Sequence, residues 1–347
     1  MEPTPPLLFL LGASHHTAPL AVREKLALDD ARAASLAARL QQTPGVSEFA
    51  LLNTCNRVEI YGVARGSDPL AALRSAFAET IGCAPADLDG VLQLRQNHDA
   101  VSHLFSVAAG LDSQIVGETE VLGQVKAAYD TALARRWTGP VLNRVFQKTF
   151  QAAKHVRTHT GIGTGQISIA SVAVDLAGKI FGDLSPVNIL VVGAGDIGLK
   201  TVQAFQSRGA KTITVASRTL SKAEEAAAQA GGWAASMAEL PEVLATADIV
   251  ASSTSSPGLV IGRDLVAAAM KRRAARPLFL IDLALPRDID PASANLANVF
   301  LYNLDDLAKI AEGNLAQREA EVARCRAILA ERTAALWPQV LRSLNSH

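Results

Sequence analysis

The segment from Val187 to Gly198, VNILVVGAGDIG, constrains the fold of this chain more than any other. An apolar strand runs into the turn Gly193-Ala194-Gly195-Asp196-Ile197-Gly198, and a helix follows. The glycines permit a tight turn, close approach of a pyrophosphate and close packing of helix on strand, while the helix N-terminus offers unpaired N–H groups to phosphates. This context predicts a βαβ unit that binds a dinucleotide. The alternative is a glycine-rich turn that binds nothing, or that binds another nucleotide or a methyl donor.

Strand-like and helical segments alternate on both sides of this turn. The strands are expected at 187–192, 212–216, 249–252 and 278–283, and the helices are expected to begin near Ile197, Leu220 and Asp264. Strands that alternate with helices at this spacing predict a parallel sheet with helices on both faces. Residues 164–302 are therefore expected to form a Rossmann-type domain.

The end of the second strand of this domain indicates which dinucleotide binds. An NAD site usually has Asp or Glu there, for the ribose 2′-hydroxyl. This chain has Ser217 and Arg218 instead, and a hydroxyl with a guanidinium suits a 2′-phosphate that an Asp would repel. The sequence predicts NADPH as the cofactor. The alternative for Arg218 is a solvated surface cation.

A length of 347 residues suits two domains with one additional segment. Outside residues 164–302 the pattern of apolar residues differs from that of alternating strands and helices. Strand-like runs at 7–13, 49–52 and 58–63 precede helical periodicity from 69 to about 160, which predicts an N-terminal α+β domain over residues 1–163. From Asn303 apolar residues recur at steps of three and four, so a long helix is expected over 303–347. The fold class is α/β with these three parts.

Composition argues against a globally basic protein that binds nucleic acid or anionic membranes, and against a membrane-spanning protein. Lys and Arg together number 33, as do Asp and Glu, so no global basic field indicates a nucleic acid or an anionic membrane. Any such partner has to be held locally. The apolar runs fall short of the roughly 18 to 20 residues that span a bilayer, and the N-terminus lacks the pattern of a signal peptide. We expect a cytoplasmic location.

A single cysteine stands in a polar corner of LLNTCNRVEIY, residues 51–61. The reactive form of cysteine is the thiolate, and a cation such as Arg57 lowers the thiol pKa from about 8.5. Arg57 also suits the carboxylate of a substrate, and the residues alone leave both roles open. The alternative for Cys55 is a buried cysteine that packs as a small hydrophobe, which its polar neighbours Thr54 and Asn56 disfavour.

A catalytic thiol together with a nicotinamide site indicates acyl transfer to sulfur followed by hydride delivery to the thioester, or the reverse oxidation. The other cysteines, Cys83 and Cys325, are best explained as structural, and no spacing indicates a disulfide or a metal site. Among the histidines of the first domain, His103 lies on a helix face next to the polar loop 110–118. A packed or surface histidine fits that pattern equally well.

With these residues the sequence resembles the glutamyl-tRNA reductase family. The matching blocks run in the family's order, as GASHHTAP at 12–19, LLNTCNRVEIY at 51–61, DAVSHLFSVAAGLDSQIVGETEVLGQVKAAY at 99–129, VVGAGDIG at 191–198 and LIDLALPRDIDP at 280–291. The resemblance implies that Cys55 takes glutamate from the 3′ end of glutamyl-tRNA as a thioester. It further implies that NADPH reduces this thioester to glutamate 1-semialdehyde, the first step of five-carbon tetrapyrrole synthesis.

The resemblance also implies the roles of particular residues. His103 is the histidine important for activity, and Arg57 forms an ion pair with the substrate. The glutamate pocket is lined by Thr54, Asn56, Arg57, Ser113, Glu118, Thr119, Glu120 and Gln124. The family usually has Glu-Pro-Gln where this chain has Glu118-Thr119-Glu120, so the chain departs from the pattern there.

The partners implied by the resemblance are glutamyl-tRNA, held by local basic patches on helices carrying Lys148, Lys154 and Arg157, and glutamate-1-semialdehyde aminomutase. The fold it implies includes a long spinal helix. Family members usually continue into a helical dimerisation domain that is largely missing before His347, so the usual homodimer is expected to be lost or made differently.

Two other functions compete with the reductase. An NADP-dependent dehydrogenase of a small carbonyl or shikimate-type substrate would work without tRNA and without Cys55. A truncated, non-catalytic paralogue would bind NADPH or tRNA and show no turnover with Cys55 intact.

Overall fold

The computed structural model describes residues 6–65, 69–118, 120–163, 168–273, 276–312 and 319–345. The chain forms two compact units, the first made of Met1–Gln166 with Asn314–His347 and the second of Ile167–Gly313. Helix α12 (Leu304–Glu312) belongs to the second unit and helix α13 (Glu319–Asn345) to the first. Residues 313–318, in the middle of the helix expected from Asn303, lie outside the described residues.

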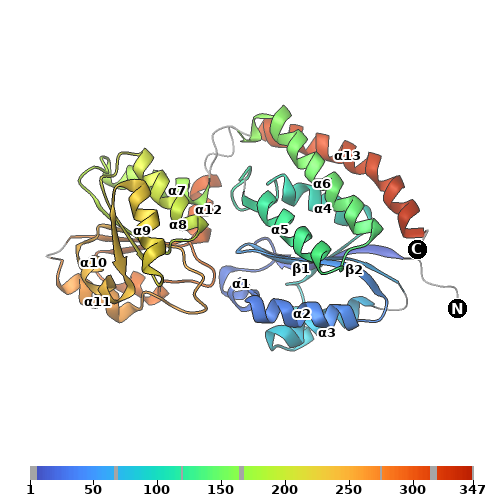
Figure 1. Ribbon diagram of the computed structural model, residues 1–347, viewed down its shortest axis with the longest axis horizontal. Helices are drawn as coiled ribbons and strands as arrows, with labels where there is room; N and C mark the ends of the chain where they lie inside the picture. The colour runs from blue at the N-terminus through green and yellow to red at the C-terminus, as the bar shows by residue number, and fades with distance from the viewer. Residues whose placement is uncertain are drawn as a thin grey trace. The chain divides into compact units, whose positions relative to one another are not determined.

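The first unit is built on a four-stranded antiparallel sheet (Figure 1). The strands lie in the order β2 (Val46–Asn53), β3 (Arg57–Ala64), β1 (Leu7–Ser14) and β4 (Gln93–Gln96). The two central strands, β1 and β3, are buried along almost their whole length, because helices cover both faces of the sheet. This explains why the first strand reads as an unbroken apolar run.

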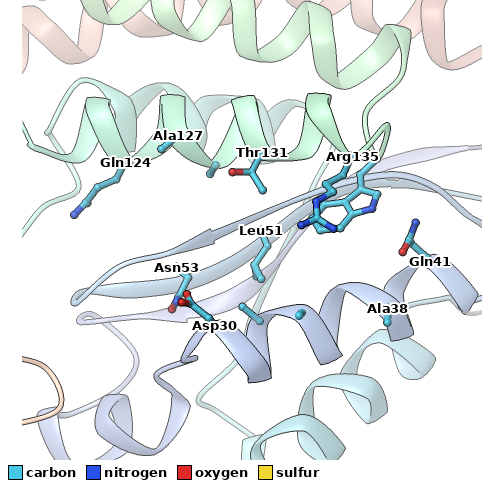
Figure 2. Close-up of a pocket in the computed structure, with 13 residues that line it drawn as sticks. Asp30, Ala38, Gln41, Leu51, Asn53, Gln124, Ala127, Thr131 and Arg135 are labelled. Carbon is cyan, nitrogen blue, oxygen red and sulfur yellow. The ribbon is translucent and has the colours of Figure 1, made fainter. Parts of the chain in front are cut away.

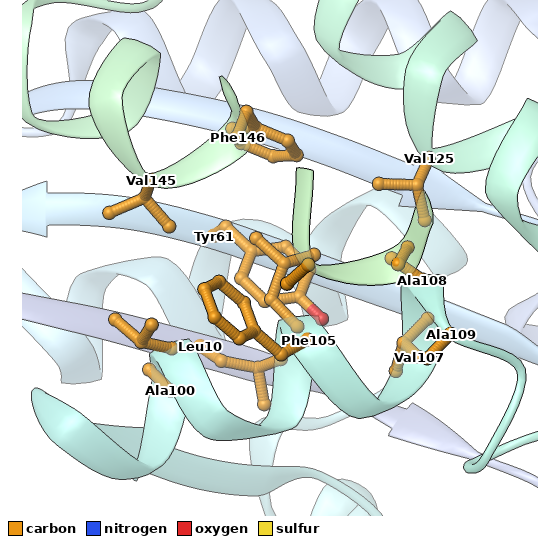
Figure 3. Packing of buried hydrophobic residues seen from close by; sticks show 14 of the residues in the cluster. Leu10, Tyr61, Ala100, Phe105, Val107, Ala108, Ala109, Val125, Val145 and Phe146 are labelled. Atoms are coloured by element: carbon orange, nitrogen blue, oxygen red, sulfur yellow. The ribbon is translucent and has the colours of Figure 1, made fainter. Parts of the chain in front are cut away.

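The helices divide between the two faces of this sheet (Figure 1). One face carries α2 (Asp30–Gln42) and α3 (Pro69–Ile81), and the short α1 (Leu20–Leu26) follows β1. The helices of the other face are α4 (His98–Ala108), α5 (Glu120–Ala134), α6 (Pro140–His159) and α13. Figure 3 shows the core on that side, where Tyr61 of β3 packs among Leu10, Phe105 and Phe146.

Strand β3 sends alternate side chains to opposite faces, and this alternation positions the site. Val58 and Ile60 pack in the core on the α2 side, whereas Tyr61 packs on the α4 side. Because side chains in a strand alternate with a period of two, Arg57 and Glu59 face α4 together with Tyr61. Two charged side chains are therefore directed into the interior of the unit.

The helical periodicity expected to dominate from 69 to about 160 is interrupted by β4, which pairs with β1 from Phe9↔Gln96 to Gly12↔Gln93. Strand β4, QLRQ, has four residues and is largely polar, as is common for a strand at the edge of a sheet. Pairing with β1, and not local propensity, determines its conformation. A 3₁₀ turn at Pro85–Leu88 precedes it.

The second unit is a six-stranded parallel sheet with flanking helices (Figure 1). The strands lie in the order β10 (Val299–Tyr302), β9 (Leu278–Asp282), β8 (Ile249–Ser252), β5 (Asn188–Val192), β6 (Thr212–Ser217) and β7 (Trp233–Ser236). The strand order reverses between β5 and β8, which is where ligands bind in open parallel sheets. Besides α12, the helices are α7 (Ile169–Phe181), α8 (Asp196–Ser207), α9 (Leu220–Ala230), α10 (Leu240–Thr246) and α11 (Arg263–Lys271).

The expected Rossmann-type fold is confirmed, and the strands not predicted from the sequence are the two edge strands, β7 and β10. Each has four residues, too few for a clear period. In the part of the chain that the structure describes, no helix has both the length and the apolar character needed to cross a membrane.

Candidate active site

Cys55 lies at the tip of the tight turn between β2 and β3. The amide of Thr54 donates to the carbonyl of Arg57 at 2.8 Å, which closes the turn. The Thr54 hydroxyl accepts from the amides of Asn56 at 3.1 Å and Arg57 at 3.2 Å. The Thr54 side chain therefore shapes the turn, and Cys55 is left half-buried at its tip.

A second cation, Arg23 of α1, holds this turn from the other side. Its Nη1 donates to the Cys55 carbonyl at 3.2 Å and to Oδ1 of Asn56 at 3.1 Å, and its Nε donates to the Ala18 carbonyl at 3.2 Å. Arg23 is only 4% exposed. Sequence reasoning missed it, because one arginine in a short helix beside Glu24 and Lys25 gives no local signal.

Arg57 is buried, with 3% exposure, and its guanidinium is bound to two carboxylates. Nη1 lies 2.7 Å from Oε1 of Glu59, and Nη2 lies 2.9 Å from Oδ1 of Asp112 and also donates to the Asp112 carbonyl. Burial lowers the pKa of Arg57, but the two carboxylates outweigh it and raise the pKa above its ordinary value. Neither acidic partner was identified from the sequence, although Glu59 is two residues from Arg57 on the same strand face.

His103 of α4 joins this buried group through Glu59. Its Nε2 lies 2.9 Å from Oε1 of Glu59, whose Oε2 accepts from the Tyr61 hydroxyl at 2.7 Å. Burial would raise the pKa of Glu59, but Arg57 and the hydrogen bond from His103 lower it to about 2. Glu59 is therefore ionised at neutral pH and accepts from an Nε2–H group. The other ring nitrogen, Nδ1, has no hydrogen-bond partner among the described residues.

The thiol of Cys55 is not activated in this state. Burial, followed by the charge of Glu118, raises the pKa of Cys55 to about 11, while Arg23 and Arg57 lower it by less. Arg57 therefore does lower the thiol pKa, one of the two roles that the residues alone left open, but burial and Glu118 outweigh it. A base is needed to remove the proton.

Three of the predicted pocket residues, Thr54, Asn56 and Arg57, have side chains that form hydrogen bonds or ion pairs within the protein, as described above. Ser113 is buried, and its Oγ has no hydrogen-bond partner among the described residues, which suits a contact with a ligand. Thr119 lies outside the described residues.

The remaining predicted pocket residues lie on or before α5. Glu118 and Glu120 are half-buried, and the Glu118 carbonyl accepts from Nη2 of Arg157 at 2.9 Å. Gln124 lines a cavity of about 660 Å³ between α2 and α5. Figure 2 shows Gln124 and Thr131 on the α5 side of this cavity, Asp30 on the α2 side, and Asn53, two residues before Cys55, on the strand between them.

In the second unit, the backbone holds the turn after β5 in place. The Gly193 amide donates to the Ala216 carbonyl at 2.8 Å, and Gly193 has φ +108°. A Cβ on Gly193 would lie 2.7 Å from the Ser253 carbonyl oxygen, and one on Gly198 would lie 2.0 Å from the Gly193 carbonyl oxygen. Only glycine fits either position, so the glycine spacing is required by the turn itself.

Three features of this turn fit a bound dinucleotide. Gly195 is the N-cap of α8, it has no side-chain cap, and a Cβ there would meet open space, so the helix N-terminus is open to a phosphate. The Oγ of Ser253 is buried beside the turn without a hydrogen-bond partner among the described residues. The adjacent strand β6 ends at Ser217, which is half-buried, and is followed by Arg218, which is exposed.

The segment after β9 is fixed by two buried aspartates. Asp288 accepts from the Ser252 hydroxyl at 2.7 Å and from the Thr254 amide at 2.7 Å, and Asp282 accepts from the Ile289 amide at 2.9 Å. These bonds join the serine-rich end of β8 to the loop after β9. They give the LIDLALPRDIDP segment a structural role at the ligand-binding edge of the sheet.

Comparisons with known families agree with this geometry in both units. The family described as "Glutamyl-tRNAGlu reductase, N-terminal domain" matches residues 11–160, which include the thiol turn, His103 and α5. The family described as "Shikimate / quinate 5-dehydrogenase" matches residues 175–310, which include the six parallel strands.

Individual relatives match over nearly the whole chain. Glutamyl-tRNA reductase of Rubrobacter xylanophilus is 43% identical over 317 residues, which cover 91% of this chain and 74% of the relative. That of Syntrophus aciditrophicus is also 43% identical, over 93% of this chain and 77% of its own length. The solved structure of glutamyl-tRNA reductase from Methanopyrus kandleri is 34% identical, with a TM-score of 0.51, and the match covers 96% of this chain and 80% of that one. This chain belongs to the glutamyl-tRNA reductase family.

Proposed function

We propose that this protein reduces glutamyl-tRNA to glutamate 1-semialdehyde with NADPH, through a thioester on Cys55. The observation that carries the proposal is the position of Cys55, a half-buried residue at the tip of a turn fixed by Arg23 and Thr54. It stands in a unit with a buried histidine and in a chain whose second unit has a dinucleotide-binding fold. A packed structural cysteine would need neither a polar turn nor these cations.

Acyl transfer requires Cys55 to lose its proton as it attacks. The Sγ–C bond to the glutamyl carbonyl carbon forms, the ester C–O bond to the terminal ribose breaks, and the thiol proton passes to the ribose oxygen. We assign the proton transfer to Nδ1 of His103, because Glu59 holds the other ring nitrogen as the donor. A thiol with a pKa of about 11 makes such a base necessary at neutral pH.

The second half-reaction returns the thiol to its starting state. NADPH, when bound, supplies the hydride that reduces the thioester carbonyl. The C–S bond then breaks, the aldehyde leaves, and the Cys55 thiolate regains a proton that His103 has taken up from solvent. The residues that would hold the dinucleotide are Gly193 to Gly198 at the pyrophosphate, with Ser217 and Arg218 at the 2′-phosphate.

The glutamyl group is a zwitterionic ligand at neutral pH, and the predicted pocket residues carry groups that match it. Ser113 has a buried hydroxyl to donate, and Gln124 has an amide in the cavity beside α5. The carboxylates of Glu118 and Glu120 suit the α-ammonium group. An ion pair of Arg57 with the substrate carboxylate would have to replace its bond to Asp112, since Glu59 and Asp112 occupy the guanidinium.

The tRNA body would be held by cations outside this pocket. Lys148 and Lys154 are exposed on α6 and are available for phosphates, whereas Arg157 is half-buried and donates to the Glu118 carbonyl. Reversal of the two lysine charges is expected to weaken tRNA binding and to reduce its salt dependence. The aminomutase partner and the homodimer remain predictions.

The test is NADPH oxidation measured with glutamyl-tRNA, with uncharged tRNA and with neither, for the wild type and Cys55→Ser. The proposal expects oxidation only with glutamyl-tRNA, loss of it in the variant, and slower turnover with NADH. Turnover that needs no tRNA and survives Cys55→Ser would show a dehydrogenase of a small carbonyl substrate. Binding of NADPH or tRNA without turnover in the wild type would show a non-catalytic paralogue.

A further inference from the structure

Arg23 has no part in the chemistry described above, yet it contacts the main chain of the reacting residue. Its fork of donors spans three oxygens, those of the Ala18 carbonyl, the Cys55 carbonyl and the Asn56 side chain. Ala18 precedes α1, so one buried side chain fixes the start of this helix and the thiol turn together. We propose that Arg23 is the positioning residue of the thiol, which fixes the main chain of Cys55 and supplies the positive charge that favours the thiolate.

The charges around the turn support Arg23 over Arg57 in this role. Among the described residues, the charged and titratable groups near the turn are Arg23 from α1, Arg57 from β3 with its partner Asp112, Glu118 from the loop before α5, and His15 and His16 from the loop after β1. Arg57 is bound to Glu59 and Asp112, whereas Arg23 donates directly to the Cys55 carbonyl and to the Asn56 side chain. Burial lowers the pKa of His15 to about 3, so His15 is neutral at neutral pH. Of the cations, Arg23 also has the larger lowering effect on the pKa of Cys55.

The positive charge of Arg23 and the planar arrangement of its guanidinium donors should have separate effects on Cys55. A lysine at position 23 retains a positive charge but has one ammonium group in place of a planar fork of donors. It therefore cannot span the same set of oxygens with fixed geometry. Loss of the charge should reduce the thiolate fraction at a given pH, and loss of the fork should misplace the thiolate that forms.

The experiment follows alkylation of Cys55 by iodoacetamide as a function of pH, without tRNA or NADPH, for the wild type, Arg23→Gln and Arg23→Lys. Peptide mass spectrometry follows Cys55 and Cys83 in the same sample, so Cys83 reports any general change. Lys25→Gln, an exposed cation on the same helix, is the matched control. Thermal unfolding of each variant shows whether it remains folded.

Arg23→Gln is expected to slow alkylation of Cys55 at pH 8 by about tenfold, because one pKa unit changes the thiolate fraction tenfold. Cys83 and the Lys25→Gln variant should not change. Arg23→Lys should keep most of the pH profile but lower kcat for glutamyl-tRNA with little change in KM. A folded Arg23→Gln with the wild-type profile would overturn the proposal. If Arg23→Gln does not fold, a folded Arg23→Lys with wild-type kcat would overturn it.

This inference rests on the proposed function, because it takes Cys55 as the reacting residue. The alkylation rate of Cys55, in contrast, can be measured whatever the function of the protein. A wild type that never turns over glutamyl-tRNA would refute the proposed function. The effect of Arg23 on Cys55 alkylation would still be measurable in that protein.

Discussion

The two candidate sites, one in each unit, are held in place by different kinds of interaction. The turn of the second unit is fixed by backbone contacts, such as the Gly193 amide to the Ala216 carbonyl, and by the absence of side chains at Gly193 and Gly198. The thiol turn of the first unit depends on buried charges, above all Arg23, Arg57 and Glu59. The first arrangement should be insensitive to pH and sensitive to a Cβ added at Gly193 or Gly198. The second should depend on pH and on each ionisable partner.

The largest expected effect is on kcat when His103 is replaced. This substitution tests whether the buried charged group takes part in proton transfer. His103→Ala should lower kcat for glutamyl-tRNA by about 10²- to 10⁴-fold, the usual contribution of a general base. His98→Ala, at the exposed start of the same helix, should leave kcat unchanged. Steady-state kinetics with both variants decides this, and a His103→Ala enzyme within a factor of two of the wild type would remove the base from the mechanism.

The next effect is the pH dependence that Glu59 gives to stability. Its pKa is lowered from 4.5 to about 2 in the folded protein, so its stabilising contribution is present above pH 4.5 and is lost as the pH falls towards 2. Between pH 7 and pH 3 the loss should be about 2 kcal/mol in the free energy of unfolding. Urea unfolding between pH 7 and pH 3 measures it in the wild type and in Glu59→Gln.

Glu59→Gln should be less stable at neutral pH, because Arg57 loses one of its two partners, and its stability should fall less on acidification. Equal pH dependence in the two proteins would contradict the assignment of the charge network to Glu59.

Glycine has two roles in the dinucleotide turn, which are to permit the fold of the turn and to let the pyrophosphate approach the backbone. An added methyl group distinguishes them. Gly195→Ala places a Cβ in open space, so the unbound protein should keep its melting temperature while NADPH affinity falls about 10- to 100-fold, since the backbone must approach the pyrophosphate. Gly178→Ala, also in open space but inside α7, should not alter affinity. Calorimetric titration with NADPH measures both. Unchanged affinity in Gly195→Ala would show that phosphates bind elsewhere.

The smallest effect is expected at Arg218, which distinguishes the two nicotinamide cofactors. Arg218→Gln should raise the Kd for NADPH about tenfold, because one charge-assisted hydrogen bond contributes roughly 1.5 to 3 kcal/mol, and should leave that for NADH unchanged. Arg272→Gln, an exposed cation at the end of α11, is the control. Equal losses for NADPH and NADH would place Arg218 away from the 2′-phosphate.

The same comparison explains how much of the molecule could be predicted from the sequence. The dinucleotide turn was predictable because its strand, its glycines and its helix follow one another within 12 residues from Val187 to Gly198. Cys55 and its turn were predictable for the same reason. The short edge strands β4, β7 and β10 were not, since each takes its conformation from a neighbouring strand.

The residues that complete the thiol site were not predictable, because they are distant in sequence. Arg23 is 32 positions from Cys55, and Asp112 is 55 positions from Arg57. Nothing in their local sequence indicates that the fold brings them together. The net sign of the Cys55 pKa shift was not predictable either, because the burial of the thiol and the nearby charge of Glu118 are tertiary properties.

The central claim is that Cys55 accepts the glutamyl group, and a single-turnover trapping experiment tests it most directly. Wild-type protein is mixed with isotopically labelled glutamyl-tRNA without NADPH, then denatured, digested and analysed by mass spectrometry. The account predicts near-stoichiometric glutamyl label on the Cys55 peptide, removed by hydroxylamine and absent from Cys55→Ser. An enzyme that turns over glutamyl-tRNA while Cys55 stays unlabelled, or a Cys55→Ser variant that keeps turning over, would contradict it.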